Sequence, residues 1–325
     1  MEYRSMGKSG LKVSEIAVGS WMTDFTGSEK AEIAEETIRL AYDKGVNFFD
    51  CADGYSGGEA ERFLGRVLKD YRRSSYVVSS KVFFPTGPSV TEAGLSRKHI
   101  FENIDRTLKN MQLDYIDLYY CHRFDPTTPV EETLRALSAL VDQGKILYYG
   151  VSEEWSGTRL MEAQTIIEKY GLHPMTSLQP QYHMMDRYIE HEIMEICEKY
   201  GIGIAPFSPL AQGLLTGKYK KGQPYPEGSR ATHQADKQVN HLLTDENLDK
   251  VAAMENIAGN LGITMSVLAL SWILRKGIIS SVITGASKPS QLESNLAATG
   301  FKIPADALEE IDKILGFTPF ERHVG

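Results

Sequence analysis

Short apolar runs alternate with longer amphipathic stretches along most of the chain. The apolar runs are rich in Val, Ile, Phe and Tyr and are apolar on both faces, which is typical of buried parallel strands. Eight such strands are predicted: Glu15–Ser20, Val46–Asp50, Tyr76–Lys81, Ile116–Cys121, Ile146–Gly150, Thr176–Gln179, Ile202–Phe207 and Ser280–Thr284. Amphipathic helices are predicted after nearly all of them, for example at Ala31–Lys44, Arg97–Met111, Val130–Gln143 and Arg187–Tyr200.

Eight strands, each followed by a helix, predict an α/β fold of the (β/α)8 (TIM) barrel type. A doubly wound sheet is the alternative, but it usually has fewer repeats. The 325 residues fit one barrel domain spanning 1–325. The stretch YRSMGKSGLKVS before the first strand predicts a β-hairpin that turns at Lys8–Gly10 and closes the barrel bottom. A long loop is expected at about 210–240 and a C-terminal helix at about 304–316.

Composition indicates which kinds of binding partner and which cellular compartment to expect. The net charge of −8 disfavours nucleic acid and anionic membrane surfaces as main partners. No run of about eighteen apolar residues occurs, so no membrane span is expected, and the N-terminus lacks the apolar core of a signal peptide. The three cysteines form no C-x-x-C pair or disulfide framework, which favours a cytoplasmic protein.

Ionisable side chains end three successive strands. Asp50 ends the second strand, Lys81 the third, and His122 follows the fourth, while Tyr55 lies one short loop beyond Asp50. One such residue means little, because a charged strand end is most often simply solvated. All four together are expected to meet on one face, because barrel active sites lie at the carboxyl ends of the strands.

These four residue types together suit the transfer of a proton to an oxygen atom. A Tyr with an ordinary pKa near 10 exchanges protons poorly at neutral pH, and a nearby Lys lowers that pKa. Asp50 would keep Lys81 charged and fixed, and His122 would hydrogen-bond a carbonyl oxygen or relay a proton. The set contains no evident nucleophile and no metal ligand cluster, so the electrons for reducing a carbonyl would come from a nicotinamide hydride.

Sites for such a cofactor are scattered along the chain. Neither a G-x-G-x-x-G turn opening a helix nor a Walker A loop is present, so a dinucleotide would lie across the barrel mouth. Phe207 is a stacking aromatic or a core residue, and Ser152 and Gln179 are carboxamide contacts or solvated strand ends. The loop and helix at Gly285–Leu296 form a phosphate site or an ordinary capped turn. Lys218 and Arg230 are phosphate clamps or surface charges.

Several motifs, in matching order and spacing, resemble the aldo-keto reductase superfamily over nearly the whole chain. They are FFDCADGYSGGEAERFLG, VVSSKVFF, LDYIDLYYCHRFDP, YYGVSEEW, SLQPQYHMM, PFSPLAQGLLTGKY and VITGASKPSQLESNL. The stretch GLSRKHIFENIDRTLKNMQLDYIDLYYCHR and the closing LEEIDKIL are similar to the branch that contains the potassium-channel β subunits and their reductase-like relatives.

The resemblance implies a catalytic tetrad and an extended NADP(H) cofactor. In it, Tyr55 is the general acid, Lys81 lowers its pKa, Asp50 pairs with Lys81, and His122 orients the carbonyl. Arg230 is implied to lie near the 2′-phosphate and Lys218 near the pyrophosphate. The cofactor contacts implied are Trp21, Asp50, Ser152, Gln179, Phe207, Ser208, Leu210, Gly213, Lys218, Arg230, Gly285, Ser287, Gln291 and Asn295. An apolar pocket for a small carbonyl substrate is expected from Trp21, Phe25, Phe83, Phe84 and Trp155.

The chain also departs from the family pattern. Many reductases have Lys and Arg where Gly285 and Gln291 stand, so Arg230 and Lys288 would take over the 2′-phosphate. Ser294 replaces an acid that contacts adenine in related proteins, and Glu153 replaces an Arg of the channel subunits.

Two functions follow from the resemblance. The first is an NADPH-dependent reductase of aldehydes or ketones, which a complete tetrad with His122 favours, because channel subunits commonly carry Asn there. The second is a slowly turning, redox-sensing regulatory subunit of a channel. The branch also implies a homo-oligomer, a tetramer or larger.

Overall fold

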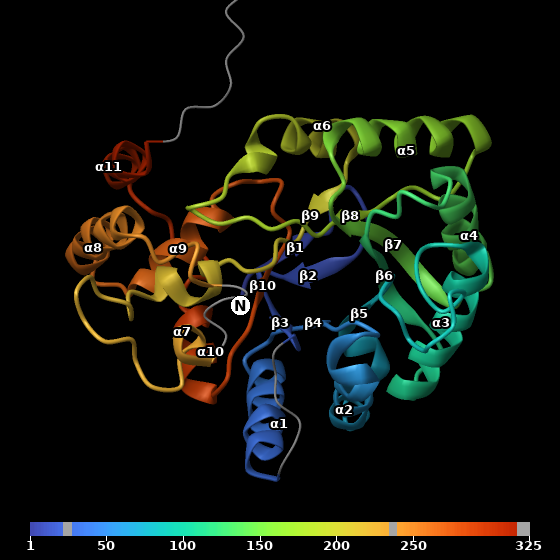
Figure 1. Cartoon of the computed structure of the whole chain (residues 1–325), viewed down its shortest axis with the longest axis horizontal. Coiled ribbons are helices and arrows are strands. Elements are labelled where there is room, and N and C mark those ends of the chain that lie inside the picture. Colours follow the sequence, from blue (N-terminus) through green and yellow to red (C-terminus); the bar gives the residue numbers. More distant parts are fainter. Residues whose placement is uncertain (22–27, 234–238, 317–325) are drawn as a thin grey trace, which may run out of the picture.

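A computed structural model describes residues 1–21, 28–233 and 239–316. Eight parallel strands form a curled sheet at the centre of the molecule, with helices around it (Figure 1). In chain order the strands of this sheet are β3 (Ile16–Gly19), β4 (Phe48–Asp50), β5 (Val77–Val82), β6 (Ile116–Arg123), β7 (Ile146–Glu153), β8 (Ser177–Leu178), β9 (Gly203–Ile204) and β10 (Val282–Thr284).

The sheet order is β10-β3-β4-β5-β6-β7-β8-β9. Its two ends also meet: Ile204 N–H donates to Ile278 O at 3.1 Å, and Ser280 N–H donates to Ile204 O at 2.8 Å. These bonds join β9 to the segment that enters β10, so the sheet closes into the predicted (β/α)8 barrel.

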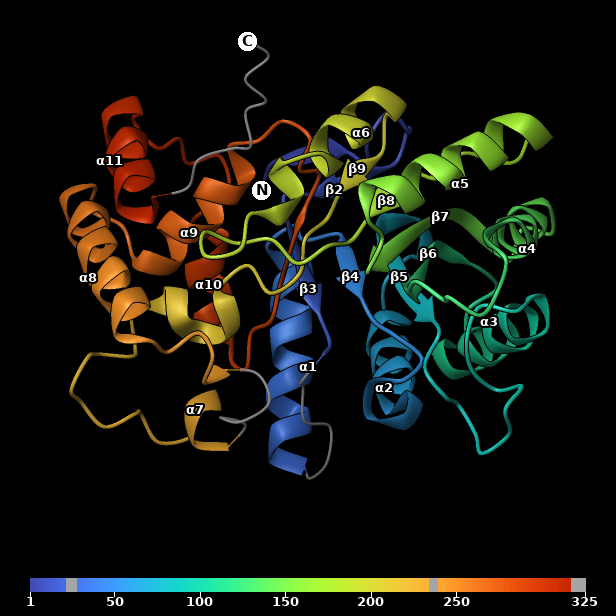
Figure 2. The same cartoon turned by 45° about the horizontal axis from the view of Figure 1, so that its top comes forward.

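Helices follow the strands as the sequence pattern predicts. The α-helices are α1 (Ser28–Asp43), α2 (Glu59–Leu68), α3 (Arg97–Met111), α4 (Val130–Asp142), α5 (Gly157–Tyr170), α6 (Ile193–Tyr200), α7 (Arg230–His233), α8 (Asp245–Asn260), α9 (Met265–Leu274), α10 (Pro289–Leu296) and α11 (Ala305–Leu315). The 3₁₀ turns are η1 (Tyr55–Gly58), η2 (Arg73–Ser75), η3 (Tyr188–Glu190) and η4 (Ala211–Thr216). After β10, α11 packs on α8, and α8 packs on α9 (Figure 2).

One predicted helix and two predicted strands differ in extent from those in the structure. The single helix expected at Arg187–Tyr200 is split into η3 and α6, where a buried ion pair between Arg187 and Glu190 fixes the first turn. Strands β8 and β9 are only two residues long. Pro180 and Pro206 follow them closely, and a proline has no N–H to extend a ladder.

The core has two parts. A large cluster lies between the sheet and the helices, as expected for a barrel whose strands are buried on both faces. A smaller cluster fills the barrel interior and is plugged by Met6 and Val13 of the N-terminal hairpin. Its other buried members are Ala17, Phe48, Val77, Leu118, Tyr120, Ala205 and Ile283.

The predicted hairpin is confirmed as β1 (Tyr3–Ser5) paired with β2 (Lys12–Ser14). It lies against the start of β9, where Lys8 N–H donates to Gly201 O at 2.9 Å. Gly7 has a left-handed φ of +56°, and a Cβ there would lie 2.2 Å from Gly201 O and 2.5 Å from Gly203 N. Only glycine fits this contact, because both neighbours are backbone atoms.

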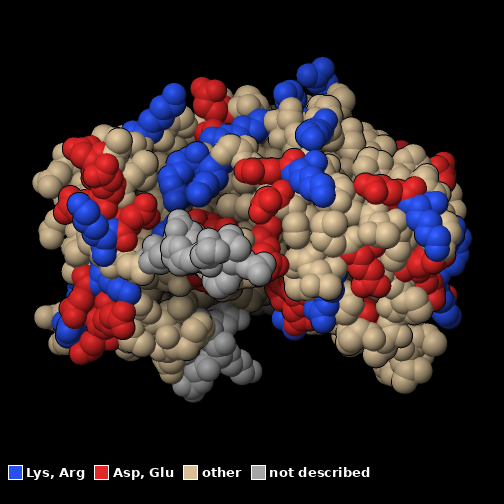
Figure 3. Space-filling model, turned by 90° about the horizontal axis from the view of Figure 1, so that it is seen from above, with Lys and Arg blue, Asp and Glu red and all other residues tan. Residues whose placement is uncertain are grey.

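Among the described residues, no single helix is long and apolar enough to cross a membrane; α8 and α9 meet the length and composition criteria together, but they are bent by 89° at their junction. On the face in Figure 3, basic and acidic side chains are interspersed in the part not drawn grey. A surface that binds the nucleic-acid backbone typically carries a continuous basic patch instead.

We predict that Gly7→Ala lowers the free energy of unfolding by about 2–4 kcal/mol, through backbone overlap and a strained φ. Urea denaturation measures the change. Gly10→Ala is the matched control in the same turn, because a Cβ at Gly10 meets no atom within 4 Å. Equal stability of both variants would contradict the role of Gly7 as the hairpin's contact with β9.

Candidate active site

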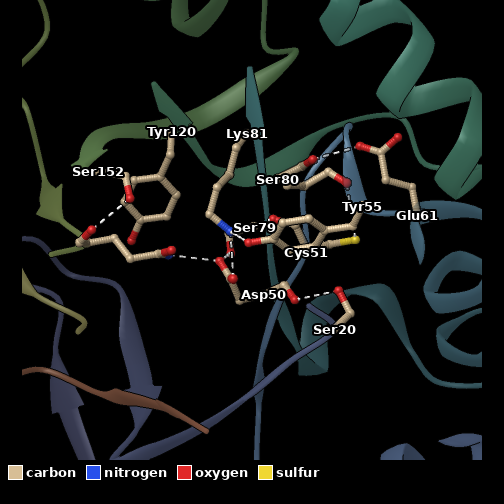
Figure 4. A network of polar contacts seen from close by, with 12 residues as sticks. Ser20, Asp50, Cys51, Tyr55, Glu61, Ser79, Ser80, Lys81, Tyr120 and Ser152 are labelled. Atoms are coloured by element: carbon tan, nitrogen blue, oxygen red, sulfur yellow. Dashed lines mark hydrogen bonds and ion pairs between the residues drawn. The ribbon is translucent and has the colours of Figure 1, made fainter. Parts of the chain in front are cut away.

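The four predicted catalytic residues come from three adjacent strands and one turn. Asp50 ends β4, Lys81 lies near the end of β5, His122 lies near the end of β6, and Tyr55 opens η1. Lys81 Nζ is 2.7 Å from Asp50 Oδ2 and 3.3 Å from the Tyr55 hydroxyl. Figure 4 shows the Tyr55 and Lys81 side chains pointing toward one another, with Asp50 beside the ammonium.

Lys81 is completely buried, and its ammonium donates to three oxygens: Asp50 Oδ2, the Tyr55 hydroxyl and Cys51 O at 2.8 Å. A buried ammonium is tolerated only when it is paired and hydrogen-bonded. Burial lowers the pKa of Lys81, but the charge and hydrogen bond of Asp50, together with the neighbouring Tyr55 and Cys51, outweigh this and raise it overall. Lys81 therefore keeps its positive charge beside Tyr55.

Asp50 is held through its second oxygen. Ser79 Oγ donates to Asp50 Oδ1 at 2.6 Å, and Gln179 Nε2 donates to the same oxygen at 2.9 Å. Ser152 Oγ donates to Gln179 O at 2.7 Å. The two residues predicted to bind a carboxamide thus lie beside the four catalytic candidates. Sequence reasoning missed Ser79. It lies two residues before Lys81 on β5 and so shares a face of the strand with it, which is the signal that could have found it.

A left-handed turn carries Tyr55 back over the strand ends. Ser56, Gly57 and Gly58 have φ values of +49°, +64° and +91°. The cluster of glycines at 54, 57 and 58 in the sequence predicts a sharp turn after the strand. Gly57 and Gly58 take the left-handed φ values of that turn, whereas Gly54 has a φ of −81°. Ser56 is strained in this region, and such strain persists only where the surroundings fix it.

Burial sets the proton state of the site. It raises the pKa of Tyr55 overall, and Lys81 only partly offsets this, so the phenol keeps its proton. Lys81 does lower the pKa of Tyr55, as predicted. Burial raises this pKa by more, so the pKa of Tyr55 is above its ordinary value. Burial, followed by the charges of Lys81 and Arg123, lowers the pKa of His122, which is therefore neutral.

His122 lies against aromatic rings. Its ring centroid is 5.7 Å from that of Tyr55 and 4.8 Å from that of Phe84, both edge-on. Its Nδ1 is buried and has no hydrogen-bond partner among the described residues. Of the other residues predicted to line an apolar pocket, Phe83 packs on Phe84, while Trp155 is buried against Phe124. Phe25 lies outside the described residues.

Asp53 lies in the turn after β4, as its place past the strand end predicts, but it does not lack a partner, as that place would also suggest. It is fully buried and accepts from Asn103 Nδ2 at 2.9 Å, and Asn103 also donates to the Tyr119 hydroxyl. Burial and the nearby Glu61 raise the pKa of Asp53 to about 7, against the opposing charge of Arg106. This buried carboxyl also accepts from the N–H of Gly54 at 2.6 Å, directly before the turn that carries Tyr55.

The loop after β9 has unusual backbone geometry. Ser208, Ala211 and Gln212 have φ values of +53°, +48° and +57°, and Gly213 follows at +101°. Such left-handed conformations cluster at ligand-binding segments. Phe207, just before this loop, is half-buried and pairs with Gln181 in an isolated bridge, and Leu210 is also half-buried.

Gln212 links the predicted cofactor residues, although sequence reasoning missed it. Its Nε2 donates to Ser208 Oγ at 2.8 Å, and its Oε1 accepts from Arg230 Nη1. The Arg230 guanidinium also lies 5.6 Å from the ring centroid of Trp21, which is 37% exposed. Arg230 and Trp21, which were each predicted as cofactor contacts, are therefore neighbours. Lys218 folds against Gly213, whose added Cβ would lie 3.0 Å from Lys218 Nζ.

The last predicted segment surrounds the start of α10. The Ser287 N–H and hydroxyl both donate to Gln291 Oε1, each at 3.0 Å. Asn295 is buried on the same helix, and a Cβ on Gly285 would meet no atom within 4 Å. Ser287 and Gln291, both predicted cofactor contacts, thus bond to each other at this helix start, with the two Ser287 donors directed at the Gln291 amide oxygen.

A sequence profile described as the Aldo/keto reductase family matches residues 15–316. The chain belongs to the aldo/keto reductase family. A probable voltage-gated potassium channel subunit beta of Oryza sativa subsp. japonica is 40% identical over 97% of this chain and 95% of its own length. The corresponding protein of Arabidopsis thaliana is 41% identical over 97% and 95%. A putative one of Schizosaccharomyces pombe is 40% identical over 98% and 94%.

Membership of this family supports an oxidoreductase, and proteins of the family typically bind a nicotinamide cofactor. The residues here fit such a group: a half-buried aromatic at Phe207, a left-handed loop after it, two cations, and open space at Gly285. No cluster of His, Cys, Asp or Glu within the described ranges has the arrangement of a metal site.

We predict that stability depends on pH through Asp53. Its folded-state pKa is above the ordinary value, so the unfolded chain loses this proton first and stability falls as pH rises from about 4 to about 7. Relative to Asp53→Asn, the wild type should lose about 2–3 kcal/mol between pH 4.5 and pH 8, measured by urea denaturation. The exposed Asp105→Asn serves as control. Parallel curves for wild type and Asp53→Asn would show that Asp53 does not titrate as described.

Proposed function

We propose that this chain is an NADPH-dependent aldo/keto reductase that reduces aldehydes or ketones to alcohols. The observation that carries the proposal is the contact of the Tyr55 hydroxyl with a fully buried, charged Lys81. When bound, the nicotinamide supplies a hydride to the carbonyl carbon.

Tyr55 is the general acid of this proposal. Its raised pKa keeps the phenol protonated, so it can give its proton to the oxygen as that oxygen gains negative charge. The proton leaves a phenolate, which the Lys81 ammonium 3.3 Å away stabilises. Asp50 keeps Lys81 charged and in place throughout.

Neutral His122 donates a hydrogen bond to the substrate oxygen in this proposal. Its lowered pKa means that it carries no charge that would compete with Tyr55 for the role of acid. The T-shaped contacts with Phe84 and Tyr55 hold the imidazole ring in one orientation. Aldehyde or ketone, hydride and proton together give the alcohol, and water then restores the proton to Tyr55.

We assign the 2′-phosphate of NADPH to Arg230. Gln212 and Trp21 hold its guanidinium, and burial lowers the pKa of this guanidinium, so an added anion would be favoured beside it. The pyrophosphate would lie along the left-handed loop Ser208–Gly213 with Lys218, and the adenosine end near Ser287 and Gln291. Gln291 would have to release Ser287 for this.

We predict that Tyr55→Phe lowers kcat for carbonyl reduction by at least about a thousandfold, because it removes the phenolic proton that would pass to the carbonyl oxygen. NADPH affinity, measured by fluorescence titration, should change less than twofold, because the ring is retained. Tyr42→Phe, a surface helix variant, is the control. Loss of NADPH binding, or unchanged turnover, would contradict the role of Tyr55.

We predict that Arg230→Ala weakens NADPH binding at least about thirtyfold and NADH binding less than threefold, because only NADPH carries the 2′-phosphate. Dissociation constants of both cofactors measure this. Lys221→Ala, which removes an exposed cation from the same loop, is the control. Equal losses for NADPH and NADH would exclude Arg230 as the 2′-phosphate contact.

A second function is supported by the relatives, which are named as potassium channel β subunits. In that case the chain is a cofactor-binding regulatory subunit, in a homo-oligomer of four or more copies. NADPH oxidation against a panel of aldehydes, ketones and quinones separates the two proposals. Tight NADPH binding with turnover of none of these compounds would favour the regulatory subunit.

A further inference from the structure

The final rung between β6 and β7 carries an ion pair at the carboxyl end of the barrel. Arg123 and Glu153 are register partners there, one residue beyond His122 and Ser152. Arg123 Nη2 lies 2.8 Å from Glu153 Oε2, and Nη1 lies 3.6 Å from Glu154 Oε1. One guanidinium therefore faces two carboxylates, and the group of three carries one net negative charge.

One aromatic ring connects this group to the reacting centre. Phe84 packs edge-on against His122, and the Arg123 guanidinium lies 5.2 Å from the Phe84 ring centroid. The ion-pair group and the catalytic candidates shift each other's pKa values. Burial raises the pKa of Glu153, and the charges of Arg123 and Lys81 oppose this, while Arg123 helps to lower the pKa of His122. The group thus lies close enough to the catalytic candidates to interact with them electrostatically.

The backbone is strained where it places the second carboxylate. Glu154 is not a glycine, yet its φ is +68°. Its carbonyl oxygen accepts from Arg159 Nη1 at 2.5 Å, and Arg159 itself lies over the Phe124 ring at 3.7 Å. These contacts fix the left-handed conformation, which a non-glycine residue adopts only at a cost. The strained turn leaves Glu153 and Glu154 on the same guanidinium.

The consequence concerns the charge of the substrate. An arginine at an active-site mouth normally recognises a carboxylate by its two-pronged donor face. Here protein carboxylates already use that face, and Glu153 is partly buried, with 28% of its side chain exposed. A second carboxylate brought to this place would meet repulsion and find the cation occupied.

We propose that Arg123, Glu153 and Glu154 make the site select carbonyl compounds that carry no negative charge near the carbonyl, with their apolar part against Phe84, and reject carboxylate-bearing ones. This inference rests on the proposed reductase function. Glu153 and Arg123 act as specificity residues, with opposite effects when neutralised.

The test compares methyl 4-formylbenzoate with 4-carboxybenzaldehyde, which share one ring and aldehyde and differ mainly in charge. The readout is the ratio of kcat/KM for ester over acid, from NADPH oxidation by the full-length protein. We expect a wild-type ratio of at least about ten. Glu153→Gln should lower the ratio at least about fivefold, and Arg123→Gln should raise it, because each removes the opposite charge.

Controls separate specificity from folding. Glu154→Gln changes an exposed side chain of the same group and should lower the ratio in the same direction as Glu153→Gln, so the test does not depend on one variant. Glu131→Gln, on α4 and paired with Arg135, should leave the ratio at the wild-type value. A merely structural role would change both substrates equally and leave the ratio constant.

The outcomes are distinct. A wild-type preference for the acid, or a ratio that none of Glu153→Gln, Glu154→Gln and Arg123→Gln shifts, overturns this inference while leaving the reductase function intact. Turnover of neither aldehyde by the wild type refutes the proposed function, and the inference falls with it. A ratio that moves in opposite directions in the Glu153 and Arg123 variants supports both.

Discussion

The site depends on one buried ion pair, between Lys81 and Asp50. An ammonium with no exposed surface is stable only if several oxygens surround it, and the end of β4 supplies two of them through Asp50 and the carbonyl of the next residue, Cys51. The remaining contact is the Tyr55 hydroxyl. Because the barrel fixes the first two, the position of the third determines whether the site can act as an acid.

The rest of the fold serves that position. The left-handed turn at Ser56–Gly58 returns Tyr55 to the strand ends, and the buried network from Asp53 to Asn103 supports the turn from below. At the opposite end, the hairpin plugs the barrel interior. The candidate site therefore lies at the carboxyl end of the strands and the closing hairpin at the amino end, which is the arrangement typical of (β/α)8 barrels.

The sequence predicted the parts of this arrangement that depend on strand order. Asp50 ends a strand and Lys81 and His122 each lie one residue before a strand end, so closing the barrel brings them together whatever the surrounding loops do. Contacts between distant side chains were not predictable in this way. Asn103 reaches Asp53 from α3, and Gln212, whose backbone is left-handed, links Ser208 to Arg230. Neither contact leaves a periodic signal in the sequence.

The net proton state of Tyr55 also lay beyond sequence reasoning. A neighbouring Lys is visible in a motif, but the extent of burial that outweighs it depends on packing. The short β8 and β9 have a similar origin, since their length depends on where Pro180 and Pro206 interrupt the ladder. Family membership supplies the general chemistry, and the local geometry determines which of these residues can take part in it.

The most direct test of the central ion pair is a double-mutant cycle on Asp50 and Lys81, read by urea denaturation and by carbonyl reduction. Lys81→Met should cost about 3–5 kcal/mol of stability, because it leaves the Asp50 carboxylate buried without its cation. Adding Asp50→Asn should recover at least half of that loss, while activity stays lost in all three variants. Additive losses of stability, or a Lys81→Met enzyme that still reduces carbonyls at the wild-type rate, would contradict the account.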